Sequence, residues 1–321
     1  MLAAYAARIS PDDPLSGLEV GERPDPDVPD GWVLVDVRAA TLNHHDLWSL
    51  RGVGLDADKL PMILGCDAAG IDSDGNEVVV HAVIGDPSVA GGDETLDPKR
   101  SLLSERYQGT LAEKVAVPKR NLVPKPAGLS FAEAACLPTA WLTAYRMLVT
   151  RGRLPENGTV LVQGAGGGVA TAAIAIARAL GATVYATSRD AEKRARAERL
   201  GAQTVETGAR LPERVDVVIE TVGKATMDHS LKSLKPGGRC VTSGSTSGHD
   251  ATIDLRRVFF LQQEIVGSTM GTRDELGALL ALCADTGLRP VVDSTYALAD
   301  ARKAFERLEA GEVFGKIVLD V

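Results

Sequence analysis

Glycines gather in one short segment of the chain, where an apolar run gives way to a run of small residues. Val160–Val162 leads into Gly164–Gly168, and apolar residues then recur at helical spacing until Gly181. Glycines allow a tight turn and let a pyrophosphate approach the main chain, while the free N–H groups and the dipole of the following helix favour the anion. With a second apolar run at 182–186, the segment predicts the strand–turn–helix–strand unit of a dinucleotide-binding fold.

The glycine pattern departs from the usual G-x-G-x-x-G. Gly164 and Gly166 begin it, but Val169 stands where the third glycine is expected, and a better register of small residues is Ala165-x-Gly167-x-x-Ala170. Glycines alone are also typical of a flexible turn. Their place between a strand and a helix favours nucleotide binding. We expect the following residues to contact the cofactor: Ala165, Gly166, Gly167, Gly168 and Val169.

The end of the second strand distinguishes between the two nicotinamide cofactors. NAD-selective sites place an acidic residue there, about 20 residues after the glycine turn, to bind the ribose 2′-OH. Here the sequence reads Thr187-Ser188-Arg189, and Ser188 can donate to a 2′-phosphate that Arg189 pairs with through its planar guanidinium. Lys193, one turn later, is within reach of the same phosphate, and Asp190 is interpreted as a helix N-cap. The alternative is that Arg189 and Lys193 only form a solvated helix start. We favour binding of NADP(H) over NAD(H).

The wider pattern divides the chain in two. Before about residue 123, short apolar runs such as WVLVDVRA at 32–39 alternate with turn residues, which is typical of a small β-barrel domain. From Ser130, which forms a capping box with Glu133, strand-like and helical segments alternate. That alternation predicts a parallel, doubly wound sheet, so the fold class is α/β.

Composition and charge exclude several function classes. The chain has 321 residues, enough for two domains, and its net charge of −8 gives no support to a nucleic-acid partner. We find no apolar run long enough to span a membrane and no signal peptide, so a cytoplasmic location is expected. The four cysteines are scattered without a C-x-x-C pair, which argues against a zinc knuckle and predicts reduced, buried thiols.

Taken in order, several motifs make the chain resemble the medium-chain dehydrogenase/reductase superfamily, and within it the zinc-independent quinone oxidoreductase-like branch. These motifs are LNHHDLW at 42–48, GCDAAG at 65–70, GTLAEKVAVP at 109–118, CLPTAWLTAY at 136–145, VLVQGAGGGVATAA at 160–173, ETVG at 220–223, LKPGGR at 234–239 and FGKIVL at 314–319. The resemblance implies a GroES-like β-barrel catalytic domain at 1–123, to which 290–321 returns, and a Rossmann NADP-binding domain at 124–289.

The resemblance also implies where a catalytic zinc would be held. Zinc-dependent relatives place their ligands at positions that match Asn43, Cys66, Asp67 and Thr139, and asparagine and threonine are poor zinc ligands. An alternative zinc site would use Cys66 and Asp67 with help from residues nearby, namely His44, His45 or Cys136. We favour a metal-free site. The polar segment 85–108 carries no cysteine, so it lacks the structural zinc lobe of those relatives, and we expect an exposed loop.

In the resembled branch, the segment that matches 43–48 lines the active site. On this basis we expect Asn43 to hydrogen-bond the nicotinamide ribose or a substrate carbonyl, and His45 to give a proton to a quinone or enolate oxygen. Asp46 is expected to orient a neighbouring loop, and Trp48 is expected to line the pocket. The alternative for His45 is a partly exposed histidine at the helix start, and the alternative for Trp48 is a core tryptophan. Further cofactor contacts are expected at Thr143, Thr221, Val222, Ser243, Gly244 and Lys316, the last with a surface lysine as its alternative.

The function expected from the resemblance is NADPH-dependent hydride transfer to a quinone or an α,β-unsaturated carbonyl, without a catalytic metal. A homodimer is expected to pair Rossmann edge strands through residues 262–269. Two alternatives stay open: a zinc-dependent alcohol dehydrogenase that uses Cys66 and Asp67, and a non-catalytic nucleotide-binding homologue.

Overall fold

The chain folds into two compact units. The computed structural model describes residues 1–321, apart from the side chain of Ala90. One unit comprises Met1–Thr139 and Gly271–Val321, and the other comprises Ala140–Met270. The first unit includes more of the chain than a division at 123/124 and 289/290 would give it, because helix α2 (Phe131–Ala135) packs on its strands and α8 (Arg273–Thr286) contacts β10.

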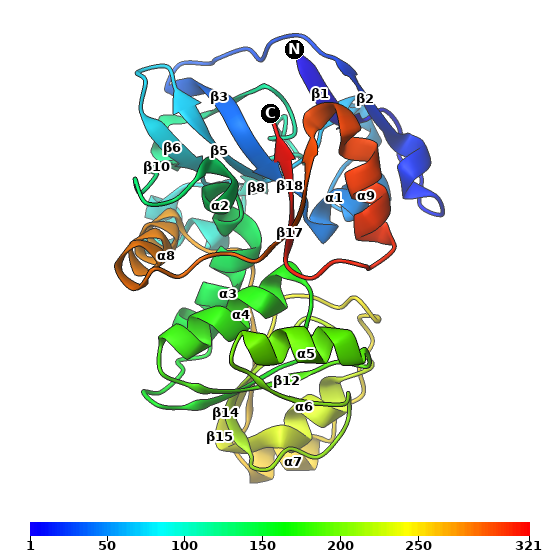
Figure 1. The fold of residues 1–321 in the computed structure, drawn as a ribbon, viewed down its shortest axis with the longest axis vertical. Coiled ribbons are helices and arrows are strands. Elements are labelled where there is room, and N and C mark those ends of the chain that lie inside the picture. Colours follow the sequence, from blue (N-terminus) through cyan, green and yellow to red (C-terminus); the bar gives the residue numbers. More distant parts are fainter. The chain divides into compact units, whose positions relative to one another are not determined.

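The first unit is mainly β-structure. Its largest sheet has the strand order β10-β6-β5-β3-β18-β17, with β9 also paired to β3, and smaller sheets join β2-β1-β4 and β7-β8 (Figure 1). Its strands are β1 (Leu2–Ala6), β2 (Leu18–Glu22), β3 (Trp32–Thr41), β4 (Met62–Ile63), β5 (Asp67–Asp72), β6 (Glu77–Val80), β7 (Val83–Ile84), β8 (Ser101–Leu102), β9 (Lys114–Pro118), β10 (Leu122–Pro124), β17 (Val292–Ala297) and β18 (Lys316–Asp320). The remaining helices of this unit are α1 (His44–Leu50) and α9 (Ala301–Glu309).

The end of the chain returns to the beginning of this unit. Strand β18 pairs antiparallel with β3, so that Val318 lies opposite Thr41, and β17 pairs parallel with β18. This register brings Lys316, the first residue of β18, beside the residues that follow β3. The GroES-like β domain expected for the amino-terminal part is confirmed.

The second unit is a six-stranded parallel sheet with the order β13-β12-β11-β14-β15-β16. Its strands are β11 (Thr159–Val162), β12 (Thr183–Thr187), β13 (Gln203–Val205), β14 (Val215–Glu220), β15 (Leu234–Thr242) and β16 (Glu264–Gly267). Its helices are α3 (Leu142–Arg146), α4 (Gly168–Ala179), α5 (Ala191–Arg199), α6 (Met227–Ser233) and α7 (Leu255–Phe260) (Figure 1). The order runs outward from β11 in both directions, which is the switch point of a doubly wound fold. The expected α/β class is confirmed.

Several local expectations are confirmed and others need correction. Ser130 and Glu133 form the capping box, with Glu133 N donating to Ser130 Oγ over 3.2 Å. Helix α3 is flanked by two π-helical turns, Leu137–Trp141 and Met147–Arg151. The segment 85–108 is not simply an exposed loop. Glu94 is 2% exposed and accepts a 2.7 Å hydrogen bond from Arg273 N, which anchors the segment at the start of α8.

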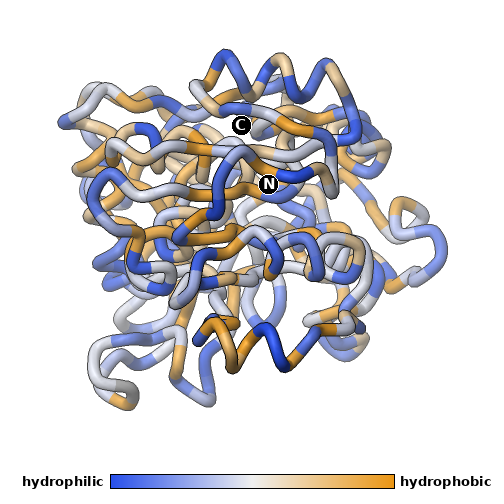
Figure 2. The backbone as a smooth tube through the Cα atoms, turned by 90° about the horizontal axis from the view of Figure 1, so that it is seen from below, coloured by the Kyte–Doolittle hydropathy of each residue, from blue (hydrophilic) through white to orange (hydrophobic). Residues whose placement is uncertain are grey.

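Polar and apolar residues are interspersed along the whole backbone (Figure 2). In the described part of the chain, no helix combines the length and the apolar character needed to cross a membrane. The four cysteines are free and buried, as expected: Cys66, Cys136, Cys240 and Cys283.

Candidate active site

Helix α1 begins directly after β3, and its first turn is held to a neighbouring loop by a buried carboxylate. Asp46 Oδ2 accepts from Asn43 N over 2.8 Å, and its Oδ1 accepts from Gly65 N over 3.0 Å. Gly65 has φ +98°, and a Cβ there would lie 2.6 Å from Leu111, so only glycine fits this close approach. Burial raises the pKa of Asp46 to about 7. Asp46 therefore orients the loop that leads to Cys66 and Asp67.

A second buried carboxylate, Asp67, gathers donors from three separate parts of the unit. Its Oδ2 accepts from Thr41 Oγ1 over 2.6 Å, from Asn43 Nδ2 over 2.8 Å and from Lys316 Nζ over 3.0 Å. The Lys316 ammonium also donates to Asn43 Oδ1 (2.6 Å) and Leu42 O (2.7 Å). We call Thr41, Asn43, Asp67 and Lys316 the Asp67 cluster. Its ion pair is fully enclosed, with side chains 2% and 0% exposed.

Three of the four residues at the positions of the family's zinc ligands have hydrogen-bond partners, whereas Thr139 Oγ1 and Asp67 Oδ1 are buried without one among the described residues. Cys66 Sγ donates to Leu103 O over 3.2 Å, and burial raises the pKa of this thiol, whereas zinc binds the thiolate. Asp67 Oδ2 is paired with an ammonium, and both amide atoms of Asn43 are used within the Asp67 cluster. Among the described residues, no three His, Cys, Asp or Glu side chains are placed to hold a metal ion. This donor set does not fit a catalytic zinc.

The other polar residues of α1 differ in burial: Ser49 is fully buried, and the Nε2 atom of His45 is buried although its side chain is partly exposed. His45 is 21% exposed, and its Nε2 lies 3.8 Å from Glu105 Oε1, too far for a hydrogen bond. Burial lowers the pKa of His45 to about 4, so the ring is neutral at pH 7. His44 is exposed. Trp48 is 38% exposed with the Arg51 guanidinium over its ring, so it is not a core residue.

The glycine turn of the second unit has an open face. Gly164 and Gly166 have φ of +77° and +132°, conformations that favour glycine. A Cβ at Gly167 would meet nothing within 4 Å, and no side chain caps the start of α4 there. Thr171 and other small residues of α4 are buried, which places the helix close to the sheet. The uncapped amides at the start of a twelve-residue helix suit a pyrophosphate, so the turn fits a dinucleotide.

The end of β12 carries cations and no free acid. Asp190 Oδ1 accepts from the amides of Glu192 and Lys193, which confirms its N-cap role. Ser188 is 7% exposed, and its Oγ accepts from Asp190 N over 3.1 Å. Arg189 is exposed. Arg194 donates to Ser188 O over 2.7 Å, so a further guanidinium lies at this strand end.

Behind the glycine turn lies a buried polar network that we call the Glu220 network: Gln163, Thr187, Glu220, Thr226 and Ser230. Glu220, the last residue of β14, is 0% exposed. Its carboxylate accepts from Val222 N (2.7 Å), Gly223 N (2.9 Å), Thr226 Oγ1 (2.8 Å to Oε2) and Ser230 Oγ (2.6 Å). The network therefore lies at the carboxyl edge of the sheet, where α/β folds bind ligands.

The other expected cofactor residues of the second unit lie on adjacent loops. The carbonyls of Thr221 and Val222 accept from Thr246 N and Ser247 N, which ties together the loops after β14 and β15. Ser243 Oγ donates to Met147 Sδ over 3.0 Å. A Cβ at Gly244 would lie 3.1 Å from Thr221 O, so the two loops run in close contact there. Thr143, on α3, is 7% exposed.

Sequence reasoning missed several of these residues. Lys316 was among the expected residues, and the alternative of a surface lysine is wrong, because the side chain is 2% exposed and its Nζ donates to Asp67 and Asn43. Glu220 ends the apolar run VDVVI, and a charged residue at that position is the signal that was available. Gln163 stands between Val162 and Gly164 and gives a similar, weaker signal.

Comparisons with known proteins agree with this architecture. A family model described as "Alcohol dehydrogenase GroES-like domain" matches residues 29–127, and one described as "Zinc-binding dehydrogenase" matches residues 168–285. The acryloyl-coenzyme A reductase of Metallosphaera sedula is 32% identical, over 94% of this chain and 96% of that protein.

Solved structures show the same likeness. The crystal structure of an NAD-dependent alcohol dehydrogenase has a TM-score of 0.91 and 34% identity, with 100% of both chains covered. The structure of the 2-octenoyl-CoA carboxylase reductase CinF with NADP and 2-octenoyl-CoA has a TM-score of 0.90 and 25% identity, and covers 99% of this chain and 87% of that one. A GroES-like β domain, a doubly wound sheet with an open glycine turn, and these relatives over nearly the whole length place the chain in the medium-chain dehydrogenase/reductase superfamily of nicotinamide-dependent oxidoreductases.

Proposed function

We propose that this protein is an NADPH-dependent reductase that transfers a hydride to a double bond conjugated with a carbonyl, without a catalytic metal. The observation that carries the proposal is the Asp67 cluster. Asn43 and Asp67, two of the four residues at the zinc-ligand positions, are hydrogen-bonded to each other and to Lys316, whose ammonium balances the charge of Asp67.

The chemistry of conjugated substrates suits such a site. Hydride addition to an isolated carbonyl produces a strongly basic alkoxide, which calls for a strong electrophile. Addition to a conjugated double bond produces an enolate whose charge is spread over several atoms, so ordinary hydrogen-bond donors are sufficient. The relatives named as an acryloyl-coenzyme A reductase and as a 2-octenoyl-CoA carboxylase reductase support a conjugated thioester as the first substrate class to test, beside enones and quinones.

The preference for NADPH is proposed from the end of β12. Arg189 is exposed and available to a 2′-phosphate, while the neighbouring Asp190 is used as a helix cap. The relative with NADP in its structure supports the same choice. When bound, the nicotinamide supplies the hydride.

The protein's own residues would orient the substrate and donate to its oxygen. Asn43 is held rigidly because Asp67 and Lys316 engage both atoms of its amide. His45 is neutral at pH 7, and its Nε2 has no hydrogen-bond partner among the described residues, so it is free to engage a developing oxyanion as a neutral donor. In this proposal the proton that completes the reduction comes from solvent.

The test is NADPH oxidation against a panel of acryloyl-CoA, crotonyl-CoA, simple enones, quinones and aldehydes, run beside NADH, with metal analysis of protein purified without chelators. We expect turnover of conjugated substrates with NADPH and substoichiometric zinc. Stoichiometric zinc together with alcohol oxidation would instead establish an alcohol dehydrogenase, the second candidate, which the 34% identical structure supports. NADPH binding without any turnover would favour a non-catalytic homologue.

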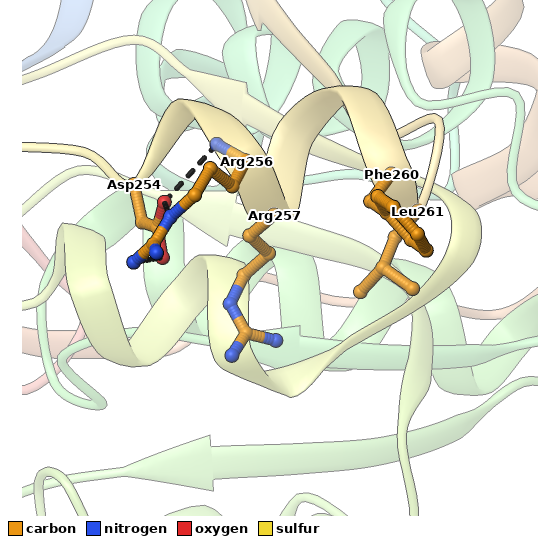
Figure 3. A pocket seen from close by; sticks show the side chains of 5 residues that line it. All are labelled: Asp254, Arg256, Arg257, Phe260 and Leu261. Carbon is orange, nitrogen blue, oxygen red and sulfur yellow. Dashed lines mark hydrogen bonds and ion pairs between the residues drawn. The ribbon is translucent and has the colours of Figure 1, made fainter.

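We further propose that the protein pairs with a second copy through residues 262–269. Strand β16 is the edge of its sheet, so its outer hydrogen-bonding groups are open to another strand. The preceding helix α7 exposes Leu255, Phe259 and Phe260, at 65%, 66% and 81%. Figure 3 shows Phe260 and Leu261 at one end of this segment and the ion-paired Asp254 and Arg256 at the other, with Arg257 between them; these five residues line a shallow hollow. An edge strand flanked by exposed aromatic residues suits a symmetric contact between identical chains.

A further inference from the structure

The hydrogen bonds of the Glu220 network form a continuous path across three adjacent strands. Gly164 N lies 3.2 Å from Thr187 Oγ1, and Thr187 Oγ1 donates to Gln163 Oε1 over 2.7 Å. Gln163 Nε2 donates to Ser230 Oγ over 2.9 Å, and Ser230 Oγ donates to Glu220 Oε2 over 2.6 Å. The path joins the first glycine of the turn to the end of β14, passing the ends of β12 and β11.

A single direction of donation runs along this path, and the carboxylate fixes it. An ionised carboxylate only accepts, so Ser230 must donate to Glu220 and must itself accept from Gln163. The Gln163 amide is thereby oriented with its oxygen toward Thr187. The second proton of Gln163 Nε2 points to His229 Nδ1 at 2.9 Å, which matches the ring tautomer whose Nδ1 accepts and whose Nε2 donates to Ala209 O at 2.8 Å. Thr187 Oγ1, having donated its own proton, is left to accept from Gly164 N.

The same carboxylate shapes the loop after β14 as well. It accepts from the amides of Val222 and Gly223, and Gly223 has φ +87° with no room for a Cβ, which would lie 2.6 Å from Gly248 O. The buried Glu220 side chain thus holds the loop after β14 directly and is linked to the glycine turn after β11 through its network. The amides of Gly164 and Ala165 donate to Thr187 Oγ1 and Thr187 O, so the first part of the turn is tied to the end of β12.

We propose that Glu220 is a positioning residue for the nicotinamide cofactor, acting through Ser230, Gln163 and Thr187 on the glycine turn. The inference rests on the proposed function in so far as a nicotinamide dinucleotide must bind at this turn. It predicts that changing the hydrogen-bond direction at Glu220 disturbs the turn that follows the neighbouring strand β11, through residues that lie between Glu220 and that turn.

The decisive variant is Glu220→Gln, which keeps the shape of the side chain and replaces one acceptor with a donor. The new amide would donate to Ser230 Oγ, whose own proton then has to leave this carboxylate and can turn to Gln163. A Gln163 amide that turns over to accept it would leave Thr187 Oγ1 facing two N–H donors. We expect the Kd values of NADPH and NADH, measured by nucleotide fluorescence, to rise together by about tenfold. The ratio of the two Kd values should stay unchanged, and hydrogen–deuterium exchange should increase in the peptide that contains the glycine turn.

A second pair of variants keeps the proposal testable if Glu220→Gln does not fold. Thr187→Val removes the acceptor of Gly164 N and should weaken both cofactors to a similar degree, whereas Thr187→Ser keeps the hydroxyl and should bind as the wild type does. The matched control is Asp216→Asn. Asp216 lies near the amino end of the same strand, β14, and its carboxylate accepts from Thr159 and Lys235. It should lower the thermal midpoint and leave both Kd values unchanged.

The outcomes separate the two proposals. If the wild type binds a nicotinamide cofactor and Glu220→Gln binds it equally well, the positioning role is overturned. The role is also overturned if Asp216→Asn weakens cofactor binding as much as Glu220→Gln at the same loss of stability. If the wild type binds neither NADPH nor NADH, the proposed function fails, and the positioning role fails with it.

Discussion

Removing the charge of Lys316 should destabilise the first unit strongly. In Lys316→Met the carboxylate of Asp67 stays buried with only two neutral donors, Thr41 and Asn43. Breaking a fully buried ion pair by removing one partner costs about 3–5 kcal/mol, because the remaining charge is left uncompensated. Asp67→Asn leaves the ammonium with two oxygen acceptors, Leu42 O and Asn43 Oδ1, so we expect its cost near the lower end of that range.

The double variant Asp67→Asn/Lys316→Met removes both charges together. Its loss of unfolding free energy should therefore be well below the sum of the single losses, with a coupling energy of at least about 2 kcal/mol. Urea unfolding followed by tryptophan fluorescence measures it, since Trp32 and Trp48, two of the three tryptophans, report on the first unit.

The matched control for this cycle is an exposed lysine with a carboxylate partner. Lys114 pairs with Asp25, and their side chains are 34% and 56% exposed. Solvent screens such a pair, so Lys114→Met should lower the free energy of unfolding far less than Lys316→Met does. If the Lys316 and Asp67 losses add to within about 0.5 kcal/mol, the buried pair is not coupled, and the reasoning that places its charge balance at the centre of a metal-free site is refuted.

Three further predictions concern the cofactor, the pH dependence of stability and the assembly. Arg189→Glu should raise the KM for NADPH by about tenfold without raising the KM for NADH. The control Arg199→Glu, at the other end of α5, should leave the ratio of the two KM values unchanged. An unchanged ratio in Arg189→Glu would contradict the assignment of Arg189 to the 2′-phosphate. Burial raises the pKa of Asp46 to about 7, so the folded state keeps a proton that the unfolded chain releases near pH 4. The unfolding free energy of the wild type relative to Asp46→Asn should therefore fall between pH 4 and 7, by up to about 1.4 kcal/mol per pH unit, and a flat or rising difference would refute it. Phe260→Glu should convert a dimer to monomers in sedimentation velocity, and a monomeric wild type would exclude the proposed contact.

The sequence alone determined the features that rest on local pattern. The glycine turn, the helix of small residues after it and the alternation of strands and helices follow from periodicities and turn residues that neighbouring positions express. Asp190 could be assigned as an N-cap for the same reason, since its partners are two and three residues away. The motifs along the chain were sufficient for the superfamily, because they recur in order over nearly its full length.

The tertiary structure decided where the charges meet. Lys316 and Asn43 are 273 positions apart, and only the antiparallel register of β18 on β3 brings the ammonium onto the Asp67 cluster. Glu220 reaches the glycine turn through Ser230 in α6, Gln163 directly after β11 and Thr187 at the end of β12, a relation that no spacing along the chain expresses. Local sequence sets which backbone conformations are favourable, whereas the pairing of distant strands sets which buried polar groups find partners. The cost of leaving such groups unpaired is what makes these two networks specific.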